Sequence, residues 1–341
     1  MIVFRADGNP QIGTGHIMRC LSLADAFQKR GVCSVFLVAE PYMQPLIRQR
    51  GYECSVLGTG YDHMENELPA LLPLLERMQP SCVILDSYFV SQNYMKAVRS
   101  RAPLVYVDDL NLFDYPADVV VNVTLYGKKI SYPANKTYLL GPRYIPLRRQ
   151  FQALEMRMPK EQIKQVLIST GGTDQYHVAL GCVSYLQEHP PTFEMMYHVV
   201  LGSMNQDVEK IWEKAEKVPC VKLHQQVTDM CGLMRKCDIA VSAAGTTLYE
   251  LCACGVPAVT YVLADNQIDG AAAFQEAGIM PCAGDVREEP EFVRCIFSEL
   301  HRLMDDWEAR REISARMQNL VDGMGAERLA AAISEMFILN I

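Results

Sequence analysis

Short apolar runs alternate with segments of helical periodicity along most of this chain of 341 residues. The runs are rich in Val, Ile and Tyr, and Ile17, Cys20 and Leu21 recur at the spacing of one buried helix face. Such alternation is typical of crossover units on a parallel sheet. It predicts strands at 2–5, 33–38, 82–86, 103–108 and 118–123, and helices at 16–29, 67–78 and 91–101.

The alternation pauses over 141–165, where a Gly-Pro segment leads into a charged stretch, and then restarts. A tail over 288–339 follows, and its pattern is almost wholly helical. In this second part the pattern predicts strands at 165–170, 195–201, 219–223, 237–242 and 257–262, and helices at 175–187, 205–217, 226–235, 247–254 and 267–277.

These two stretches predict an α/β protein with two domains and a helical tail. We place the N-terminal domain at 1–147, a linker at 148–163, the C-terminal domain at 164–322 and a C-terminal helix at 323–341. We expect the helical tail to cross back and brace the first domain.

Charge and composition exclude several classes of protein. The net charge of −8 gives no general basic field that would attract nucleic acid. The charge is uneven, because residues 1–150 carry net +3 and the remainder carries net −11. The 12 cysteines are scattered without a CxxC pair, which is typical of reduced thiols. These thiols predict a cytoplasmic protein. The sequence has no secretory leader and no run of 18 apolar residues, so we expect no membrane insertion. We also expect a monomer.

The loop after the first predicted strand carries Gly13 and Gly15 and leads into His16. Glycines permit close backbone approach, and the N-terminus of a helix favours an anion. The same helix dipole opposes a protonated imidazole, so we expect His16 to be neutral and able to accept a proton, with Arg19 on the same face. An ordinary turn with a capping histidine remains the alternative. A dinucleotide fingerprint is disfavoured, because Met18 stands where its third glycine should be.

A second glycine-rich loop follows the strand that opens the second predicted domain. Gly171 and Gly172 suit a loop packed against a ligand or against the opposite lobe. A plain turn is equally consistent with the pattern, with Thr173 or Asp174 capping the next helix.

A third loop of small residues contains Ser242, Gly245 and Thr246 and precedes another predicted helix. Its backbone amides could cradle a diphosphate, and Glu250 could accept both hydroxyls of a ribose. The competing interpretation is a capping box, in which Glu250 and Thr247 bind only the start of their own helix.

Other polar residues stand near predicted strand ends. Asn266 and Gln267 offer neutral amides to the same edge of the sheet, although a helix cap would also explain them. Asp86, Asp108 and Asp109 lack a His or Glu at ligand spacing, so we predict no metal site there. We interpret the remaining histidines, which lack any such context, as surface or structural residues: His63, His177, His189, His198, His224 and His301.

Several motifs recur together in one order from residue 2 to about residue 330. They are Arg5-Ala6-Asp7 with Gln11–His16 and Arg19, Leu85–Tyr88, Val107–Asp109, Leu147–Phe151, Thr170–Asp174, the Glu250 helix, Asn266-Gln267 and Asp322–Arg328. In this combination the chain resembles the UDP-2,4-diacetamido-2,4,6-trideoxy-β-L-altropyranose hydrolases of pseudaminic acid biosynthesis. The wider family includes spore-coat polysaccharide proteins.

The resemblance implies a glycosyltransferase-like GT-B architecture, with two Rossmann-like lobes and UDP held mainly by the second. It also implies hydrolysis at the anomeric carbon with inversion, without metal or cofactor. Carried onto this chain, the catalytic base falls on His16, the ribose ligand on Glu250, and substrate contacts on Arg148 and Asn266. We add further expected substrate-binding residues from the loops above: Gly13, Gly15, Arg19, Gly171, Gly172, Ser242, Gly245, Thr246 and Gln267.

The chain departs from the family pattern at Ser87, where some members have His, and in its small Gly13–Gly15 loop. Both departures could change which sugar fits. Two other functions remain possible: an inverting GT-B glycosyltransferase and a non-catalytic UDP-sugar-binding protein. A transferase of that fold would act on a lipid-linked acceptor, and residues 41–50 could supply its membrane-facing patch, although an ordinary amphipathic helix explains them better.

Overall fold

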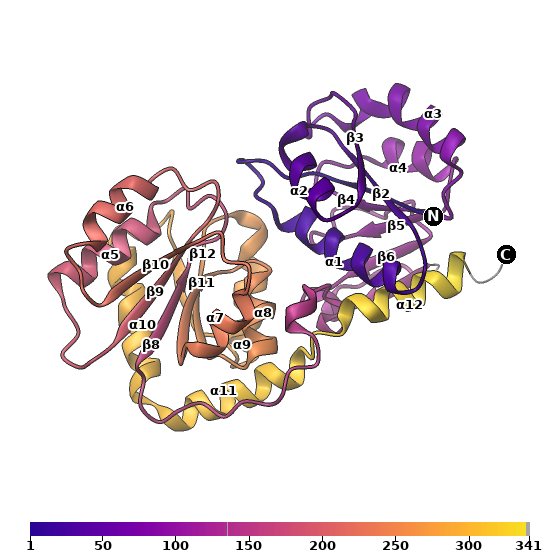
Figure 1. Cartoon of the computed structure of the whole chain (residues 1–341). Helices are drawn as coiled ribbons and strands as arrows, with labels where there is room; N and C mark the ends of the chain where they lie inside the picture. Colours follow the sequence, from indigo (N-terminus) through magenta and orange to yellow (C-terminus); the bar gives the residue numbers. More distant parts are fainter. Residues whose placement is uncertain (135, 339–341) are drawn as a thin grey trace. The chain divides into compact units, whose positions relative to one another are not determined.

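The computed structural model describes residues 1–134 and 136–338, and its contacts divide the chain into two units (Figure 1). The first unit is Met1–Arg149 together with the chain from Gly323 onward, and the second unit is Gln150–Asp322. Each unit has its own parallel sheet and its own apolar core.

The first unit is a parallel sheet with helices on its faces. Its elements are β1 Ile2–Ala6, α1 Gly15–Lys29, β2 Ser34–Val38, α2 Gln44–Gln49, β3 Glu53–Val56, α3 Leu68–Met78, β4 Cys82–Asp86, α4 Gln92–Arg99, β5 Leu104–Val107, β6 Val119–Asn122 and β7 Thr137–Leu140. The strand order is β3-β2-β1-β4-β5-β6-β7, and neighbouring strands are parallel. The order reverses between β1 and β4, the position where open α/β sheets bind ligands.

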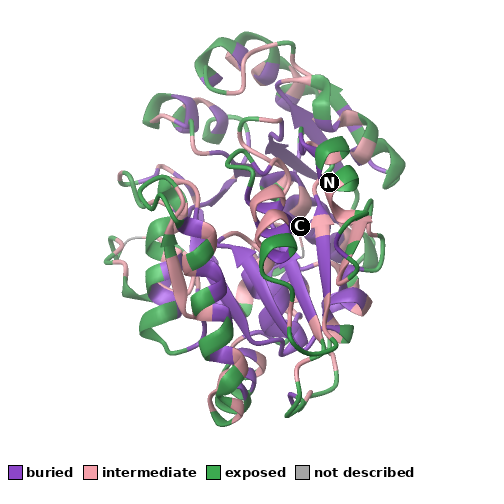
Figure 2. Cartoon of the chain, turned by 90° about the vertical axis from the view of Figure 1, so that its left-hand side faces the viewer, coloured by how far each residue is buried: buried purple, intermediate pink, exposed green. Residues whose placement is uncertain are grey.

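The strands between the two edge strands β3 and β7 are mostly apolar and buried because helices cover both faces of the sheet. On one face Phe4 stacks on Phe36, with ring centroids 4.9 Å apart, and meets Phe27 of α1 edge-on. On the other face Val3 and Leu71 belong to a core that includes α3 and α4. Figure 2 shows the central strands as buried and the outward helix faces as exposed.

The helix α12, Gly325–Phe337, packs in the first unit although it lies at the end of the chain. It contacts α1 and the short 3-10 helix Pro142–Tyr144. Lys29 and Glu327 form an ion pair between α1 and α12. Gly325 allows the close approach, since a Cβ there would lie 2.1 Å from the carbonyl oxygen of Ile145.

Replacing Gly325 with Ala should therefore destabilise the first unit by about 2–4 kcal/mol, because backbone atoms cannot rotate away from the new methyl group. Thermal or urea unfolding measures the loss. Gly270→Ala is a matched control, because its Cβ would meet no atom of the described residues within 4 Å. We expect that control to be neutral or slightly stabilising, since Ala favours a helix interior. Equal effects of the two substitutions would contradict the role of Gly325.

The second unit is built in the same way. Its elements are β8 Gln165–Ser169, α5 Val178–Glu188, β9 Met196–Leu201, α6 Val208–Ala215, β10 Val221–Gln225, α7 Met230–Lys236, β11 Ile239–Ala243, α8 Thr247–Cys254, β12 Ala258–Val262, α9 Ile268–Glu276, β13 Cys282–Asp285, α10 Phe292–Asp305 and α11 Trp307–Leu320. The strand order is β10-β9-β8-β11-β12-β13, with parallel neighbours. The order reverses between β8 and β11, so both units present a switch point.

The segment between the two sheets lies along the second unit. The guanidinium of Arg310 is fully buried and donates to the carbonyl oxygens of Leu303, at 3.0 Å, and Glu161, at 2.7 Å. The buried carboxylate of Asp238 accepts from the backbone of Lys164 and Gln165 at 2.9 and 3.0 Å. These bonds attach Glu161, near the end of the predicted linker 148–163, to α11, and they attach the start of β8 to the residue before β11.

The predicted α/β architecture, with two parallel-sheet units and a helical C-terminal tail, is confirmed. The structure adds three strands that the sequence pattern does not indicate, β3, β7 and β13. Each of them lies at the edge of its sheet. The tail consists of α10, α11 and α12, and α12 contacts α1.

Candidate active site

The loop between β1 and α1 is held in a tight turn. Asn9 and Gly13 exchange two backbone hydrogen bonds, of 2.8 and 3.2 Å, and the side chain of Asn9 accepts from the amides of Gln11 and Ile12. Gly13 has φ of +75°, which its lack of a Cβ permits. Because α1 begins at Gly15, His16 lies in the first turn of the helix, as the sequence predicts, and is 7% exposed.

The strand β4 ends beside this loop and supplies the partner of His16. Ala6 pairs with Asp86 across β1 and β4, so the carboxylate of Asp86 lies at the same edge as the start of α1. Its Oδ1 lies 2.6 Å from Nδ1 of His16. Arg19 donates to both carboxylate oxygens of Asp86 at 2.6 Å.

This arrangement determines the charge of Asp86 and the tautomer of His16. Burial opposes ionisation of Asp86, but the Arg19 cation outweighs it and holds the pKa of that carboxyl well below its usual range. An ionised carboxylate only accepts hydrogen bonds, so Nδ1 of His16 carries the proton and donates it to Asp86. Nε2 is then the basic nitrogen, and it makes no hydrogen bond to the described residues.

The loop after β5 completes the group through Asp109. Its Oδ2 accepts from Nη1 of Arg19 at 2.8 Å and from the hydroxyl of Tyr88 at 3.0 Å. The ring of Tyr88 meets the imidazole of His16 edge-on, with centroids 4.5 Å apart. The first unit thus joins His16, Arg19, Asp86, Tyr88 and Asp109 into one polar cluster, buried except for the half-buried Tyr88, which we call the His16 cluster.

The sequence singles out Asp86 and Asp109 as polar residues near strand ends but assigns them no connection to His16. Tyr88 is likewise predicted as a polar residue near a strand end, within the motif Leu85–Tyr88, and without a connection to His16. Arg148, the other predicted substrate contact of this unit, is half-buried near its boundary with the second unit. Gly15 is exposed at the first residue of α1.

In the second unit, the loop after β8 carries the exposed Gly171, with φ of +84°. The carbonyl of Gly172 packs so closely against Gly202 that a Cβ on Gly202 would lie 2.2 Å from it. Asp174 accepts from the amides of Val178 and Ala179, the first two residues of α5, at 2.9 and 3.0 Å. Asp174 therefore caps the next helix, and burial raises the pKa of its carboxyl.

The loop after β11 leads into α8. The hydroxyl of Ser242 is buried and donates to the carbonyl of Ala243 at 3.1 Å. A Cβ on Gly245 would meet no atom of the described residues within 4 Å, so the space beside it is open. Thr246 is the N-cap and Thr247 the first residue of α8, which differs from the capping box that the sequence allows. Glu250 is buried in the first turn of the helix.

The loop after β12 contains a 3-10 helix, Asp265–Gln267. Asn266 is exposed there, and Gln267 accepts from the amide of Leu263 at 3.1 Å. Because β8, β11 and β12 are adjacent and parallel, the three loops that follow them meet at the carboxyl ends of these strands. The expected residues of the second unit come together there.

Other features of the molecule lie apart from these loops. Over residues 1–134 and 136–338, no three His, Cys, Asp or Glu side chains are placed to hold a metal ion. In the same residues no helix is both long and apolar enough to span a bilayer.

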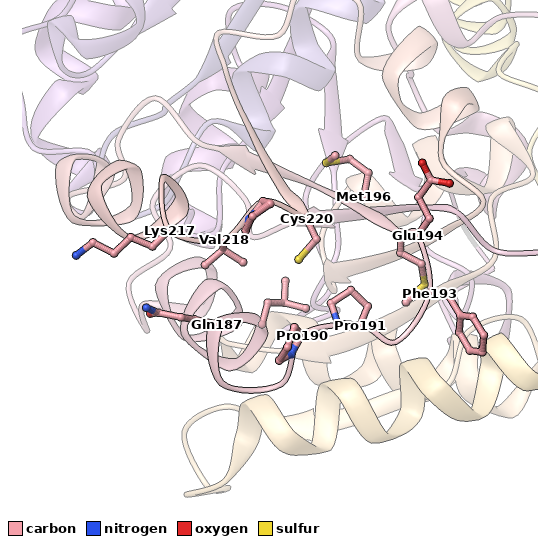
Figure 3. Close-up of a pocket in the computed structure, with 12 residues that line it drawn as sticks. Gln187, Pro190, Pro191, Phe193, Glu194, Met196, Lys217, Val218 and Cys220 are labelled. Carbon is pink, nitrogen blue, oxygen red and sulfur yellow. The ribbon is translucent and has the colours of Figure 1, made fainter.

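A pocket lined by Pro190, Phe193, Met196 and Cys220 lies near the starts of β9 and β10, at the opposite ends of the strands from the loops (Figure 3).

Among the histidines without a predicted role, His198 is buried. It lies 2.6 Å from the amide oxygen of Gln165 and 2.9 Å from Nε2 of His224. Burial and the neighbouring His224 lower the pKa of His198 to about 4. His177 is exposed and contacts the carboxylate of Asp207.

Comparison with known proteins gives relatives of low identity that extend over most of the chain. No protein-family model matches it. The chain is 24% identical over 340 residues to the spore coat polysaccharide biosynthesis protein SpsG of Bacillus subtilis, and 97% of each chain is covered. It is 24% identical over 255 residues to the UDP-2,4-diacetamido-2,4,6-trideoxy-beta-L-altropyranose hydrolase of Campylobacter jejuni, covering 73% of this chain and 86% of that protein.

A third relative carries two named activities. The chain is 25% identical over 277 residues to the pseudaminic acid cytidylyltransferase and UDP-2,4-diacetamido-2,4,6-trideoxy-beta-L-altropyranose hydrolase of Helicobacter pylori. The match covers 78% of this chain and 45% of that longer protein.

Solved structures agree on the fold. MurG of Acinetobacter baumannii matches with a TM-score of 0.71 at 15% identity, covering 98% of this chain and 99% of that one. The calicheamicin glycosyltransferase CalG4 matches with a TM-score of 0.65 at 15% identity, covering 98% and 97%. Both are GT-B glycosyltransferases, and the two parallel-sheet units share that architecture. The chain is therefore similar over most of its length to SpsG and to the UDP-2,4-diacetamido-2,4,6-trideoxy-β-L-altropyranose hydrolases.

Proposed function

We propose that this protein hydrolyses UDP-2,4-diacetamido-2,4,6-trideoxy-β-L-altropyranose to UDP and the free sugar, as a cytoplasmic monomer in pseudaminic acid biosynthesis. The observation that carries the proposal is the 2.6 Å contact between Nδ1 of His16 and Asp86, which leaves Nε2 as a base at the switch point of the first sheet. Two relatives bear the name of this hydrolase, which supports the choice of substrate.

In the proposed reaction, a water oxygen attacks the anomeric carbon while Nε2 of His16 removes one of its protons. The bond between that carbon and the diphosphate oxygen breaks on the opposite face, and UDP leaves with the electron pair. Attack opposite to the leaving group inverts the configuration. The imidazolium that forms is stabilised by the ionised Asp86, to which it is already hydrogen-bonded.

We propose that UDP is held mainly by the loops after β8, β11 and β12. Glu250 in the first turn of α8 would accept the ribose hydroxyls, and the open space beside Gly245 suits close approach of a phosphate. The hydroxyl of Ser242 already donates to a backbone carbonyl, so this loop would act through Gly245 and Thr246. The remaining proposed contacts are Gly13, Gly15, Arg148, Gly171, Gly172, Asn266 and Gln267.

Hydrolysis in water enriched in oxygen-18 tests the proposal, followed by NMR and mass spectrometry of both products. We expect the label in the sugar, the α anomer as the first product, and unchanged turnover in the presence of EDTA. Label in UDP would mean attack at phosphorus and would contradict the proposal. Loss of turnover with EDTA would contradict its metal independence alone.

The same experiment separates the two alternatives. A glycosyltransferase would release UDP only when an acceptor is added, and the likeness to MurG and CalG4 bears on the fold alone. A binding protein would retain UDP-sugar without turnover. Light scattering against the chain mass of 38.4 kDa tests the monomer.

A further inference from the structure

Arg19 is built into the first unit differently from a residue that binds substrate. It is 8% exposed, and its Nε and Nη2 donate to Asp86 while Nη1 donates to Asp109 at 2.8 Å. Three of the five N–H groups of its guanidinium are therefore directed at two carboxylates. A phosphate or sugar hydroxyl would have to compete with these charge-assisted bonds.

Each of those carboxylates in turn holds an aromatic ring. Asp86 accepts from Nδ1 of His16, and Asp109 accepts from the hydroxyl of Tyr88 at 3.0 Å. The two rings meet edge to face, with an interplanar angle of 77°. The guanidinium thus lies between the two groups that orient the proposed base and its neighbouring ring.

We infer that Arg19 is a positioning residue: it fixes His16 and Tyr88 relative to each other through Asp86 and Asp109, and it keeps Asp86 as a hydrogen-bond acceptor. This inference rests on the proposed function, in which His16 is the base. It replaces the expectation from the sequence that Arg19 contacts substrate.

The physical reason is the state of Asp86 without its cation. Without Arg19, the buried Asp86 would lose the cation that lowers its pKa, and it would take up a proton at higher pH than it does beside Arg19. A protonated Asp86 can donate to Nδ1 of His16, which moves the imidazole proton to Nε2 and removes the basic nitrogen. The reaction would then fail at a higher pH on its acid side.

Besides Tyr88, Asp109 and His16 of the His16 cluster, two more titratable groups face Asp86. They are Cys20 of α1, whose Sγ lies 3.5 Å from Oδ2, and Tyr106 of β5. Burial raises the pKa of both the Cys20 thiol and the Tyr106 hydroxyl well above their usual values. Both stay neutral around neutral pH, so a shifted acid limb of the pH–rate profile does not come from them.

The test compares Arg19→Met, Arg19→Lys and Asp109→Asn with the exposed control Arg30→Met, which lies just after α1. Steady-state rates with the UDP-sugar are measured across pH, and affinity for UDP is measured by calorimetry. We expect Arg19→Met to lower kcat by about 10²-fold, with KM and the Kd of UDP almost unchanged. The acid limb of the pH–rate profile of Arg19→Met should move up by about one pH unit or more. Arg19→Lys should restore part of both effects, and Arg30→Met should match the wild type.

A readout without substrate separates this inference from the proposed function. Nitrogen-15 NMR of the imidazoles, with His16 assigned from its own variant, reports which ring nitrogen carries the proton. We expect Nδ1 in the wild type and in Asp109→Asn, and a changed pattern in the Arg19 variants. This measurement stands even if no UDP-sugar is hydrolysed.

Two results would overturn the inference. One is a raised KM and weaker UDP binding with kcat retained, which would make Arg19 a substrate ligand. The other is an unchanged His16 spectrum and pH profile in a folded Arg19 variant. If Arg19→Met does not fold, Arg19→Lys keeps the charge and Asp109→Asn tests the second carboxylate, so both outcomes remain observable.

Discussion

His16→Ala is expected to lower kcat for UDP-sugar hydrolysis by about 10²–10⁴-fold, because it removes the group that takes the proton from water. Affinity for UDP should change little, since the proposed nucleotide contacts lie mainly in the loops of the second unit. Initial rates give kcat and KM, and calorimetry with UDP gives the binding constant.

Asp86→Asn tests the role of His16 as the base, because it replaces the hydrogen-bond partner of His16 with a side chain of the same shape. Its amide can donate to Nδ1 of His16, which favours the tautomer with the proton on Nε2, so we expect a loss comparable to that of His16→Ala. The double variant should lose no more than either single one, because the two residues act as a unit. His63→Ala is the matched control, since His63 is exposed and distant in sequence from these loops.

Near-normal turnover of His16→Ala would contradict its role as the base. A variant that lost UDP binding together with turnover would point instead to a binding role for His16. Circular dichroism and a melting curve for each variant show whether the fold is kept.

Glu67→Gln is expected to destabilise the first unit by about 3–5 kcal/mol, because it weakens a fully buried ion pair. Glu67 accepts from Nε and Nη2 of Arg5 at 2.6 Å, and from the hydroxyl of Tyr94 at 2.6 Å. Nη1 of Arg5 donates to Asp7 at 2.5 Å, and Asp7 also accepts from the amide of Ala39 at 2.7 Å. The network ties the ends of β1 and β2 to the 3-10 helix Met64–Glu67, which precedes α3, and to α4. Asp7 belongs to the loop that leads to His16.

Urea unfolding of the two variants Glu67→Gln and Glu65→Gln measures this effect. Glu65 lies in the same 3-10 turn and undergoes the same chemical change, but it is exposed, so its substitution should change stability by less than about 0.5 kcal/mol. The double variant Arg5→Met with Glu67→Gln should cost less than the sum of its single variants, since Arg5→Met leaves Glu67 buried without its cation and Glu67→Gln leaves Arg5 with Asp7 as its one carboxylate partner. Equal losses for Glu65→Gln and Glu67→Gln, or strict additivity, would contradict this account.

The central strands of both sheets could be predicted from the sequence to within about two residues. β1, β4, β8 and β11 are buried on both faces, so they appear as uninterrupted apolar runs. The strands that were missed, β3, β7 and β13, are all edge strands with partly exposed residues. An edge strand has one neighbour and less apolar surface to bury, so its sequence carries little signal.

The site could be predicted only in part for a related reason. The loop of His16 is visible in the sequence because its glycines, its turn and its helix start are contiguous. Its partner Asp86 is 70 residues away in the chain, and they meet because β1 and β4 are neighbours in the sheet. The role of Arg19 depends in the same way on Asp109, which follows β5.

The sequence by itself thus determined the two α/β units, their glycine-rich loops and the histidine at the start of α1. These features follow from local preferences and from periodic burial, which are written in consecutive residues. The tertiary structure determined which carboxylate orients His16, that the donors of Arg19 are engaged by Asp86 and Asp109, and that α12 packs in the first unit. Those outcomes depend on strand order and close packing between residues far apart in the chain, and no local pattern encodes them.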